Sequence, residues 1–210
     1  MTPTRLLLVR HGETDWARDW RHTGRTDVPL NAHGVQQARR LQGILPLDGV
    51  KAVWSSPLSR AADTAALAGL HVDRFDDDLM EWDYGPAEGR TTEEIRLDHP
   101  GWEIWHDGVH VLAPADGTIH QPGHDNPPAS VGETVDQVGE RVDRVIARAR
   151  TVEGMVVVVA HAHLCRILAA RWVGLPASGG RHFALDPAGW ALLAWTRDEP
   201  VVERWNPPPP

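Results

Sequence analysis

Three short apolar runs limit the fold of this 210-residue chain more than any other feature. They cover Leu6–Val9, Val50–Trp54 and Met155–Ala160, and each is too short for a core helix. Segments with helical spacing of apolar residues separate them, so we expect buried parallel strands joined by helices. The predicted fold class is therefore α/β: a three-layer α/β/α sandwich with a largely parallel central sheet.

Capping residues and apolar spacing predict five helices and one further strand. The helices are expected from an Asn31 cap over 32–45, from Ser56-Pro57 to Gly69, after a capping box at Thr91–Glu94, after a second capping box at Ser130–Glu133, and over Leu164–Trp172. The fourth helix carries an apolar stripe of Val135, Val138, Val142, Val145 and Ala149. Residues 72–75 are the candidate strand.

The composition excludes some classes of function. A formal net charge of −8 argues against a general nucleic-acid binder, which needs a basic face. Cys165 is the only cysteine, so no intrachain disulfide can form. Together with the lack of an export signal or a stretch long enough to span a membrane, this predicts a cytoplasmic protein without nucleic-acid or membrane partners.

Polar side chains follow the predicted strands at the points where the strands end. His11 and His161 come directly after two of the apolar runs, and Arg60 lies in the first turn of the helix after another. Ligands of such sheets bind outside the carboxyl ends of the strands. We therefore expect these three side chains to meet at one edge of the sheet.

The string Arg10-His11-Gly12-Glu13 carries the chemistry of the prediction. A neutral imidazole can attack phosphorus and hold the phosphoryl group as phosphohistidine. Arg10 can neutralise the phosphate oxygens, and Gly12 allows close approach of the backbone. On its own the string is a weak motif, because His11 could also be a buried, hydrogen-bonded histidine.

Four motifs in order resemble those of the histidine phosphatase superfamily, which is also called phosphoglycerate-mutase-like. They are residues 9–16 with 23–30, residues 54–61, residues 81–89, and residues 156–161. Within the superfamily the chain looks most like the small bacterial acid phosphatases. The resemblance implies a single domain over 1–206, with a loop-rich cap at about 76–130 over the active site, followed by a Pro-rich tail at 207–210.

The resemblance also implies roles for individual residues. His11 would be the nucleophile and Glu81 the proton donor and acceptor. The phosphate-binding residues would be Arg10, Arg60 and His161, and the substrate-binding residues would be Thr23 and Gly24. Neither a metal nor a cofactor is implied. The expected partner is a small phosphorylated metabolite, and a homodimer is allowed.

Several alternatives stay open at this point. Glu81 could be one more solvated charge after the acidic run at 76–78, with Glu88 as the competing acid. His161 and His163 form a His-x-His pair that fits a metal, but a third ligand is not evident. Further histidines at four-residue spacing lie in a segment that we expect to be one long loop over 99–129. They are His106, His110, His120 and His124.

The chain also departs from the family pattern. Ala17 stands where many members have Asn, and Ala162 follows His161 where many have Gly. The loop at about 105–130 is longer than in the small phosphatases, and we expect it to shape leaving-group selection. These departures bear on substrate specificity more than on chemistry.

Four functions are compatible with the motifs. A cofactor-independent phosphatase for phosphate monoesters is the main hypothesis. A phosphoglycerate-mutase-type enzyme would need a second cationic cluster, yet no lysine or arginine lies between Arg96 and Arg141, which leaves Arg21, Arg25 and Arg90 to supply it. The others are a phosphohistidine protein phosphatase and a non-catalytic phospho-ligand sensor.

Five tryptophans could line an apolar pocket or belong to the core: Trp16, Trp20, Trp82, Trp102 and Trp105.

Overall fold

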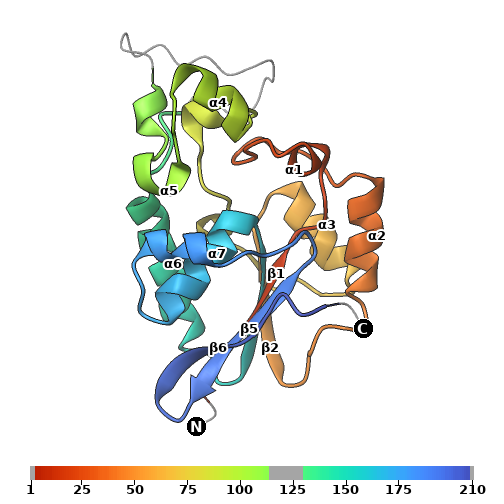
Figure 1. Cartoon of the computed structure of the whole chain (residues 1–210). Coiled ribbons are helices and arrows are strands. Elements are labelled where there is room, and N and C mark those ends of the chain that lie inside the picture. Colours follow the sequence, from red (N-terminus) through yellow and green to blue (C-terminus); the bar gives the residue numbers. More distant parts are fainter. Residues whose placement is uncertain (1–2, 114–129, 209–210) are drawn as a thin grey trace.

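A mixed, mostly parallel sheet forms the centre of the computed structural model, which describes residues 3–113 and 130–208 (Figure 1). In these residues the strands follow the order β3-β2-β4-β1-β5-β6. Their bounds are β1 (Arg5–Arg10), β2 (Val50–Ser55), β3 (Arg74–Phe75), β4 (Met155–Ala160), β5 (Trp190–Thr196) and β6 (Glu199–Trp205). Strands β1 to β4 pair in parallel, as predicted, and β4 is buried along its whole length.

The antiparallel hairpin of β5 and β6 was not predicted. Strand β5 pairs with β1 and β6 pairs with β5, so the hairpin extends the sheet beyond β1. Arg197 lies in the turn with a φ of 58°, a left-handed conformation that only a few per cent of residues other than glycine adopt. Because the turn lacks the glycine or asparagine typical of hairpins, the local sequence gives no clear signal for it.

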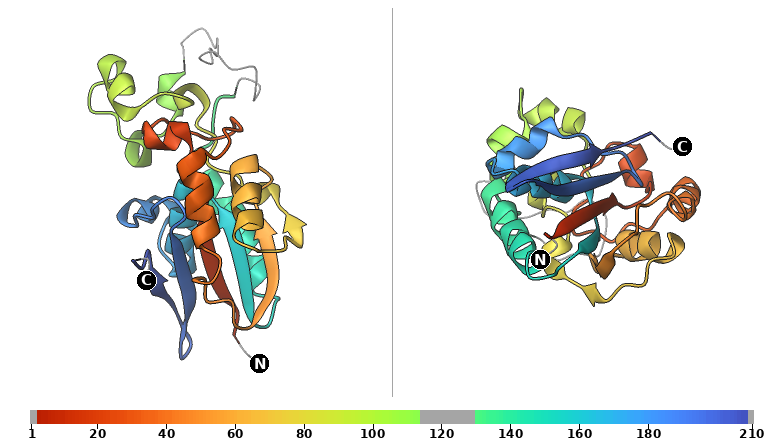
Figure 2. Two further views of the ribbon diagram at one scale, coloured as in Figure 1. Left: turned by 90° about the vertical axis from the view of Figure 1, so that its right-hand side faces the viewer. Right: turned by 90° about the horizontal axis from the view of Figure 1, so that it is seen from below.

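Helices cover both faces of the sheet. The α-helices are α1 (Asp15–Arg18), α2 (Ala32–Arg40), α3 (Ser59–Leu67), α4 (Thr92–Asp98), α5 (Ile104–Asp107), α6 (Val135–Ala149) and α7 (Ala162–Trp172), and the 3₁₀ helices are η1 (Asp77–Leu79), η2 (Gly85–Ala87), η3 (His110–Leu112) and η4 (Ala177–His182). Seen from below, the sheet runs between α6 on one side and α2 and α3 on the other (Figure 2). None of the helices in the described ranges is long and apolar enough to cross a membrane.

Alternation along the strands divides the apolar residues into two cores. Leu6 and Leu8 of β1 face the core that contains α6 and α7. Leu7 and Val9 face the core that contains α2 and α3. This period-two pattern is what a strand covered on both faces requires, and it explains why the run Leu6–Val9 is apolar throughout.

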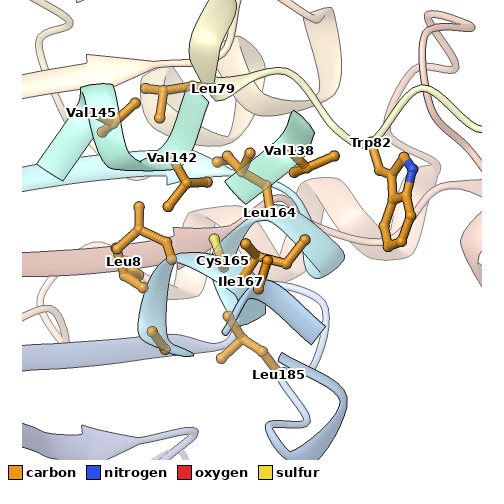
Figure 3. Close-up of a cluster of buried hydrophobic side chains, with 14 of the residues drawn as sticks. Leu8, Leu79, Trp82, Val138, Val142, Val145, Leu164, Cys165, Ile167 and Leu185 are labelled. Atoms are coloured by element: carbon orange, nitrogen blue, oxygen red, sulfur yellow. The ribbon is translucent and has the colours of Figure 1, made fainter. Parts of the chain in front are cut away.

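The core under α6 and α7 is built by the predicted valine stripe. Val138, Val142 and Val145 of α6 are fully buried and lie close to Leu164 of α7 (Figure 3). Leu79 of η1 lies beside the same valines. The segment that leads to Glu81 is therefore anchored in the hydrophobic core on this face of the sheet.

Helix boundaries differ from the predicted ones in three places. Asn31 caps α2 by accepting a hydrogen bond from Gly34 N at 2.8 Å, as predicted, but the helix ends at Arg40 instead of residue 45. The chain turns there and continues through Gly43, whose φ of +89° is outside the helical region. Helix α3 begins at Ser59 instead of Ser56-Pro57, and α7 begins at Ala162, two residues early.

The capping box predicted at Ser130–Glu133 is wrong. Thr134 caps α6 and forms a capping box with Gln137. Ser130 donates instead to Asp83, and the Glu133 carboxylate accepts hydrogen bonds from Arg141. By contrast, the capping box at Thr91–Glu94 is confirmed.

The long loop predicted over 99–129 is partly wrong as well. Its first part contains α5 and η3, in which Ile104, Trp105 and Leu112 are buried. Burial of these large apolar side chains stabilises turns that are too short to show helical periodicity. The remainder of that loop, with His120 and His124, and the end of the predicted tail lie outside the described residues.

Two glycines let the loop after β1 pack directly on α2. A Cβ on Gly12 would lie 2.5 Å from the carbonyl oxygen of Gly34, and a Cβ on Gly34 would overlap the backbone of Glu13. Both contacts involve main-chain atoms, which cannot move aside as the end of a side chain can. The loop that carries His11 therefore depends on a small residue at each position.

We predict that Gly34→Ala destabilises the protein, although alanine favours helices, because its methyl group would push the Glu13 backbone away from α2. Overpacking of this kind typically lowers the free energy of unfolding by about 1 to 3 kcal/mol. Urea unfolding checks this. The control is His33→Ala at the exposed neighbouring position of the same helix, expected to change stability by less than about 0.5 kcal/mol. Equal stability of the two variants would contradict the packing argument.

Candidate active site

Two adjacent parallel strands place His11 and His161 side by side. Arg10 at the end of β1 is in register with Ala160 at the end of β4, and a histidine follows each. The two imidazole rings lie with centroids 5.1 Å apart and planes at 62°. Arg60 reaches the same place from the first turn of α3. The three side chains expected to meet at one edge of the sheet do meet there.

His11 is held in one orientation. Its ring is 5% exposed, and Nδ1 lies 2.6 Å from the carbonyl oxygen of Gly12. A carbonyl can only accept, so Nδ1 carries a proton and donates it to this bond. Burial lowers the pKa of His11 well below its ordinary value, and the charges of Arg60 and Arg10 lower it further. The neutral ring therefore keeps a lone pair on Nε2.

Arg60 is fully buried, yet its hydrogen-bond acceptors are almost all neutral. Its guanidinium donates to Nδ1 of His161 at 3.2 Å and to the carbonyl oxygens of Thr26, Thr23 and Gly24 at 2.9, 3.2 and 2.8 Å. The Asp27 carboxylate lies 3.9 Å away. A buried cation with mostly neutral partners leaves a positive field that an anion can neutralise.

His161 caps α7 and is fully buried. Because Nδ1 accepts from Arg60, the proton of the neutral ring is on Nε2, which donates to Ser56 Oγ at 2.8 Å. Burial lowers the pKa of His161 well below its ordinary value, with Arg60 and His11 adding to the effect. Both histidines are thus neutral when no anion is bound.

Arg10 has an N–H group that finds no acceptor in the part of the chain that the structure describes. Nη1 donates to the carbonyl oxygen of Leu185 at 2.5 Å. Nε is buried and has no hydrogen-bond partner among the described residues. Burial lowers the pKa of Arg10, and the negative charge of Glu81 acts in the opposite direction. An unpaired buried N–H is costly, so this group favours a ligand that supplies an acceptor.

Glu81 is buried, which excludes the alternative of a solvated surface charge. Its carboxylate accepts hydrogen bonds from the N–H groups of Trp82, Leu164 and His163, at 3.0, 3.0 and 3.1 Å. Two of these donors belong to the first turn of α7. Glu81 therefore lies at the end of the helix that His161 caps.

Glu88, the competing acid, has a different position. Its carboxylate accepts from Gly24 N at 2.9 Å and from Thr26 N at 3.1 Å. Burial raises the pKa of Glu88, although the hydrogen bonds from Thr26 and Gly24 oppose the rise. Glu88 therefore shapes the loop whose carbonyl groups hold Arg60.

Substrate binding by Thr23 and Gly24 stays a prediction. The main-chain N–H of Gly24 is already engaged with Glu88.

His163 is part of an aromatic cluster. Its Nδ1 lies 2.5 Å from the hydroxyl of Tyr84, and its ring lies 5.0 Å from that of Trp105.

Within residues 3–113 and 130–208, no three His, Cys, Asp or Glu side chains are grouped to hold a metal ion. Trp82, Trp102 and Trp105 are core residues, whereas Trp20 is 82% exposed.

Two residues that position the site were not singled out from the sequence. Ser56 is the partner of His161, and Thr64 accepts a hydrogen bond from Gly12 N at 3.0 Å while donating to the Arg60 carbonyl at 2.7 Å. Thr64 lies four residues after Arg60, so the two share one face of α3. That spacing could have identified Thr64 once Arg60 was chosen.

The chain is similar in sequence and in fold to known proteins. The sequence profile of the family described as "Histidine phosphatase superfamily (branch 1)" matches residues 6–208. An acid phosphatase of Mycobacterium tuberculosis is 42% identical over 91% of this chain and 86% of its own. Sedoheptulose 1,7-bisphosphatase of Saccharomyces cerevisiae is 34% identical over 83% of this chain and 69% of its own. A solved structure of an open reading frame product from Mycobacterium tuberculosis superposes with a TM-score of 0.82 at 34% identity, covering 97% of both chains.

We predict that His11 titrates below the ordinary imidazole pKa of about 6.5 and that its neutral form carries the proton on Nδ1. Imidazole ¹⁵N NMR of the folded protein measures both properties. Arg10→Met should raise the pKa of His11, because it removes a nearby positive charge, and added inorganic phosphate should raise it further. A pKa at or above about 6.5, or a proton on Nε2, would contradict the geometry described above.

Proposed function

The chain belongs to the histidine phosphatase superfamily, and we propose that it is a cofactor-independent phosphatase that hydrolyses phosphate monoesters through a phosphohistidine on His11. The observation that carries the proposal is the neutral His11 ring, with its free Nε2 lone pair, beside the buried Arg60 and the partly buried Arg10. Such a site attracts a phosphate dianion and presents a nucleophile to it at the same time. The expected substrate is a small phosphorylated metabolite.

Binding of the phosphate would involve Arg10, Arg60 and His161. The unpaired Nε of Arg10 would donate to one phosphate oxygen, and Arg60 would neutralise the charge. For His161 to bind the phosphate, its Nε2–H would turn from Ser56 Oγ to a phosphate oxygen, while Nδ1 continues to accept from Arg60. The two arginines and His161 would stabilise the negative charge of the transition state, so no step is assigned to a metal ion.

The reaction would proceed in two displacements. In the first, Nε2 of His11 forms a bond to phosphorus while the ester P–O bond breaks, and Glu81 gives its proton to the leaving alkoxide. In the second, Glu81 takes a proton from water, the water oxygen attacks phosphorus, and the N–P bond breaks. Phosphate leaves, His11 is neutral again and Glu81 is protonated for the next cycle.

A monophosphate substrate fits this site better than the bisphosphate that a mutase must hold. The three arginines available for a second phosphate are all engaged with carboxylates. Arg21 binds Glu94 at 3.0 and 3.1 Å, Arg90 binds Asp98 at 3.0 Å, and Arg25 lies 3.4 Å from Glu133. To bind a second phosphate, each would have to give up an existing partner.

The low pKa of His11 supports activity in acid, as the name of the acid phosphatase relative implies for that protein. Burial and the two arginines keep the nucleophile neutral to a lower pH than an exposed histidine would remain neutral. A lowered pKa of the nucleophile moves the acid side of the rate profile to lower pH. On the acid side, activity is lost as the pH falls through the lowered pKa of His11, so the acid limb of the rate profile would lie below about 6.5.

We predict that His11→Ala lowers turnover of p-nitrophenyl phosphate by about 1,000-fold or more while the fold is kept, because no other side chain can replace the nucleophile. The control is His33→Ala, which should retain full activity. Rapid quench with ³²P-labelled substrate, in the presence of EDTA, should place an acid-labile, base-stable label on His11. A label on another residue, or turnover that stops with EDTA and returns with zinc, would refute the mechanism.

We predict that Glu81→Gln slows hydrolysis of alkyl phosphates by about 100- to 10,000-fold and that of p-nitrophenyl phosphate far less. An alkoxide needs a proton in order to leave, whereas nitrophenolate is already a good leaving group. The measurement is kcat/KM across a series of aryl and alkyl phosphates, because the later hydrolysis of phosphohistidine, in which Glu81 also acts, affects kcat but not kcat/KM. The matched control is Glu88→Gln, for which losses should be similar for all leaving groups. If Glu88→Gln shows the dependence on leaving group instead, the acid must be reassigned to Glu88.

A further inference from the structure

Arg141 of α6 is buried, and all five of its N–H groups are engaged. Nε and Nη2 donate to the two oxygens of Glu133, at 2.8 and 3.0 Å. The other three bonds go to main-chain carbonyls: Nη1 to Asp78 and Met80 at 2.9 and 2.7 Å, and Nη2 to Glu81 at 3.0 Å. A single guanidinium therefore holds the backbone on which Glu81 is placed.

This backbone has little support from regular structure. The 3₁₀ helix η1 ends at Leu79, and residues 80–84 belong to no helix or strand. Three of the carbonyl groups just before and at Glu81 are satisfied by Arg141. Without that side chain they would need other donors, and the segment would be free to take other conformations.

Glu133 holds the other side of the same segment. Its carboxylate accepts from Asp83 N at 2.9 Å, and its carbonyl accepts from Trp82 Nε1 at 2.8 Å. Burial acts to raise the pKa of Glu133, but the hydrogen bonds and charge of Arg141, the Asp83 N–H and the charge of Arg25 together keep it below the ordinary value. The ion pair thus binds the chain on both sides of Glu81: Arg141 binds the residues before it, and Glu133 binds the two residues after it.

We propose that Arg141, paired with Glu133, is a positioning residue for Glu81, which it keeps aligned for proton transfer to the leaving group. Helix α6 fixes the main chain of Glu81 through Arg141, and α7 binds its carboxylate through the N–H groups of His163 and Leu164. The two helices pack against each other through Val138, Val142 and Leu164 (Figure 3). The inference rests on the proposed role of Glu81 as the acid.

Two neighbouring arginines provide a matched control. Arg144 and Arg148, on the same helix, bind the side chains of Asp78 and Asp76 at 2.6 and 2.7 Å. No hydrogen bond joins either of them to the main chain of residues 78–81 among the described residues. Arg144→Met therefore removes a cation and an ion pair from the same helix and segment, but leaves the three carbonyl bonds intact.

The test compares Arg141→Lys, Arg141→Met, Arg144→Met and Glu81→Gln on p-nitrophenyl phosphate and on an alkyl phosphate series. A lysine keeps the charge but cannot reach all five acceptors. We expect both Arg141 variants to lower kcat/KM for alkyl phosphates by about 10- to 100-fold, since small misplacements of a reacting group cost up to about 100-fold. The kcat/KM for p-nitrophenyl phosphate should fall less than about 3-fold, and inhibition by inorganic phosphate should be unchanged. Arg144→Met should show neither loss.

Non-additivity is the second measurement. In a Glu81→Gln background, Arg141→Lys should add almost nothing to the loss on alkyl phosphates, because the group that it positions is already absent. If Arg141→Met does not fold, Arg141→Lys and Glu133→Gln serve in its place, and the latter should show the same leaving-group dependence at smaller size.

Equal losses on all leaving groups, or losses that multiply with Glu81→Gln, would overturn the positioning role and leave Arg141 as a stabilising residue only. If Glu81→Gln shows no leaving-group dependence at all, the acid assignment under the proposed function fails, and the role of Arg141 fails with it.

Discussion

The buried guanidinium of Arg60 is the interaction on which the rest of the site depends. Removing a charge from water is costly unless polar groups surround it, and here those groups come from separate parts of the chain. The carbonyls of the loop at 23–26 and the ring of His161 all point to it. Through Thr64, its own helix also holds the loop that carries His11. One buried cation thus determines where His11, the loop and the second histidine lie.

The same interaction explains the electrostatics. Because the acceptors of Arg60 are mostly neutral, its charge remains available to a ligand. Burial lowers the pKa of the two neighbouring histidines, and the charge of Arg60 lowers it further. A closely paired arginine would have neither effect. Arg141, on the opposite face of the sheet, shows the contrast: Glu133 neutralises it, and its remaining donors are spent on the backbone. Of the two buried arginines, Arg60 is suited to an anion and Arg141 to holding a segment in place.

Much of the site was predictable because parallel strands leave few choices. Once Leu6–Val9 and Met155–Ala160 are strands of one parallel sheet, the histidines after them must emerge at the same edge. Glu81 could not be assigned in this way, since it follows no strand or long helix and its neighbours in sequence are acidic. Its burial against α7 arises from contacts more than 80 residues apart in sequence. Arg141 and Glu133 were overlooked for the same reason, and Glu133 was even assigned to a capping box that does not form.

The sequence by itself determined the class of fold, the parallel strands, and the residues that meet at their ends, because period-two burial and strand-end positions are local properties of the chain. It also determined the capped start of α2 and the apolar stripe of α6, which follow from helical spacing. Only the tertiary structure decided the protonation of His11 and His161, the burial of Glu81, and the pairing of Arg21, Arg25 and Arg90 with carboxylates. Those properties depend on which charges and carbonyl groups approach a side chain from distant segments, and no spacing within the sequence encodes such distances.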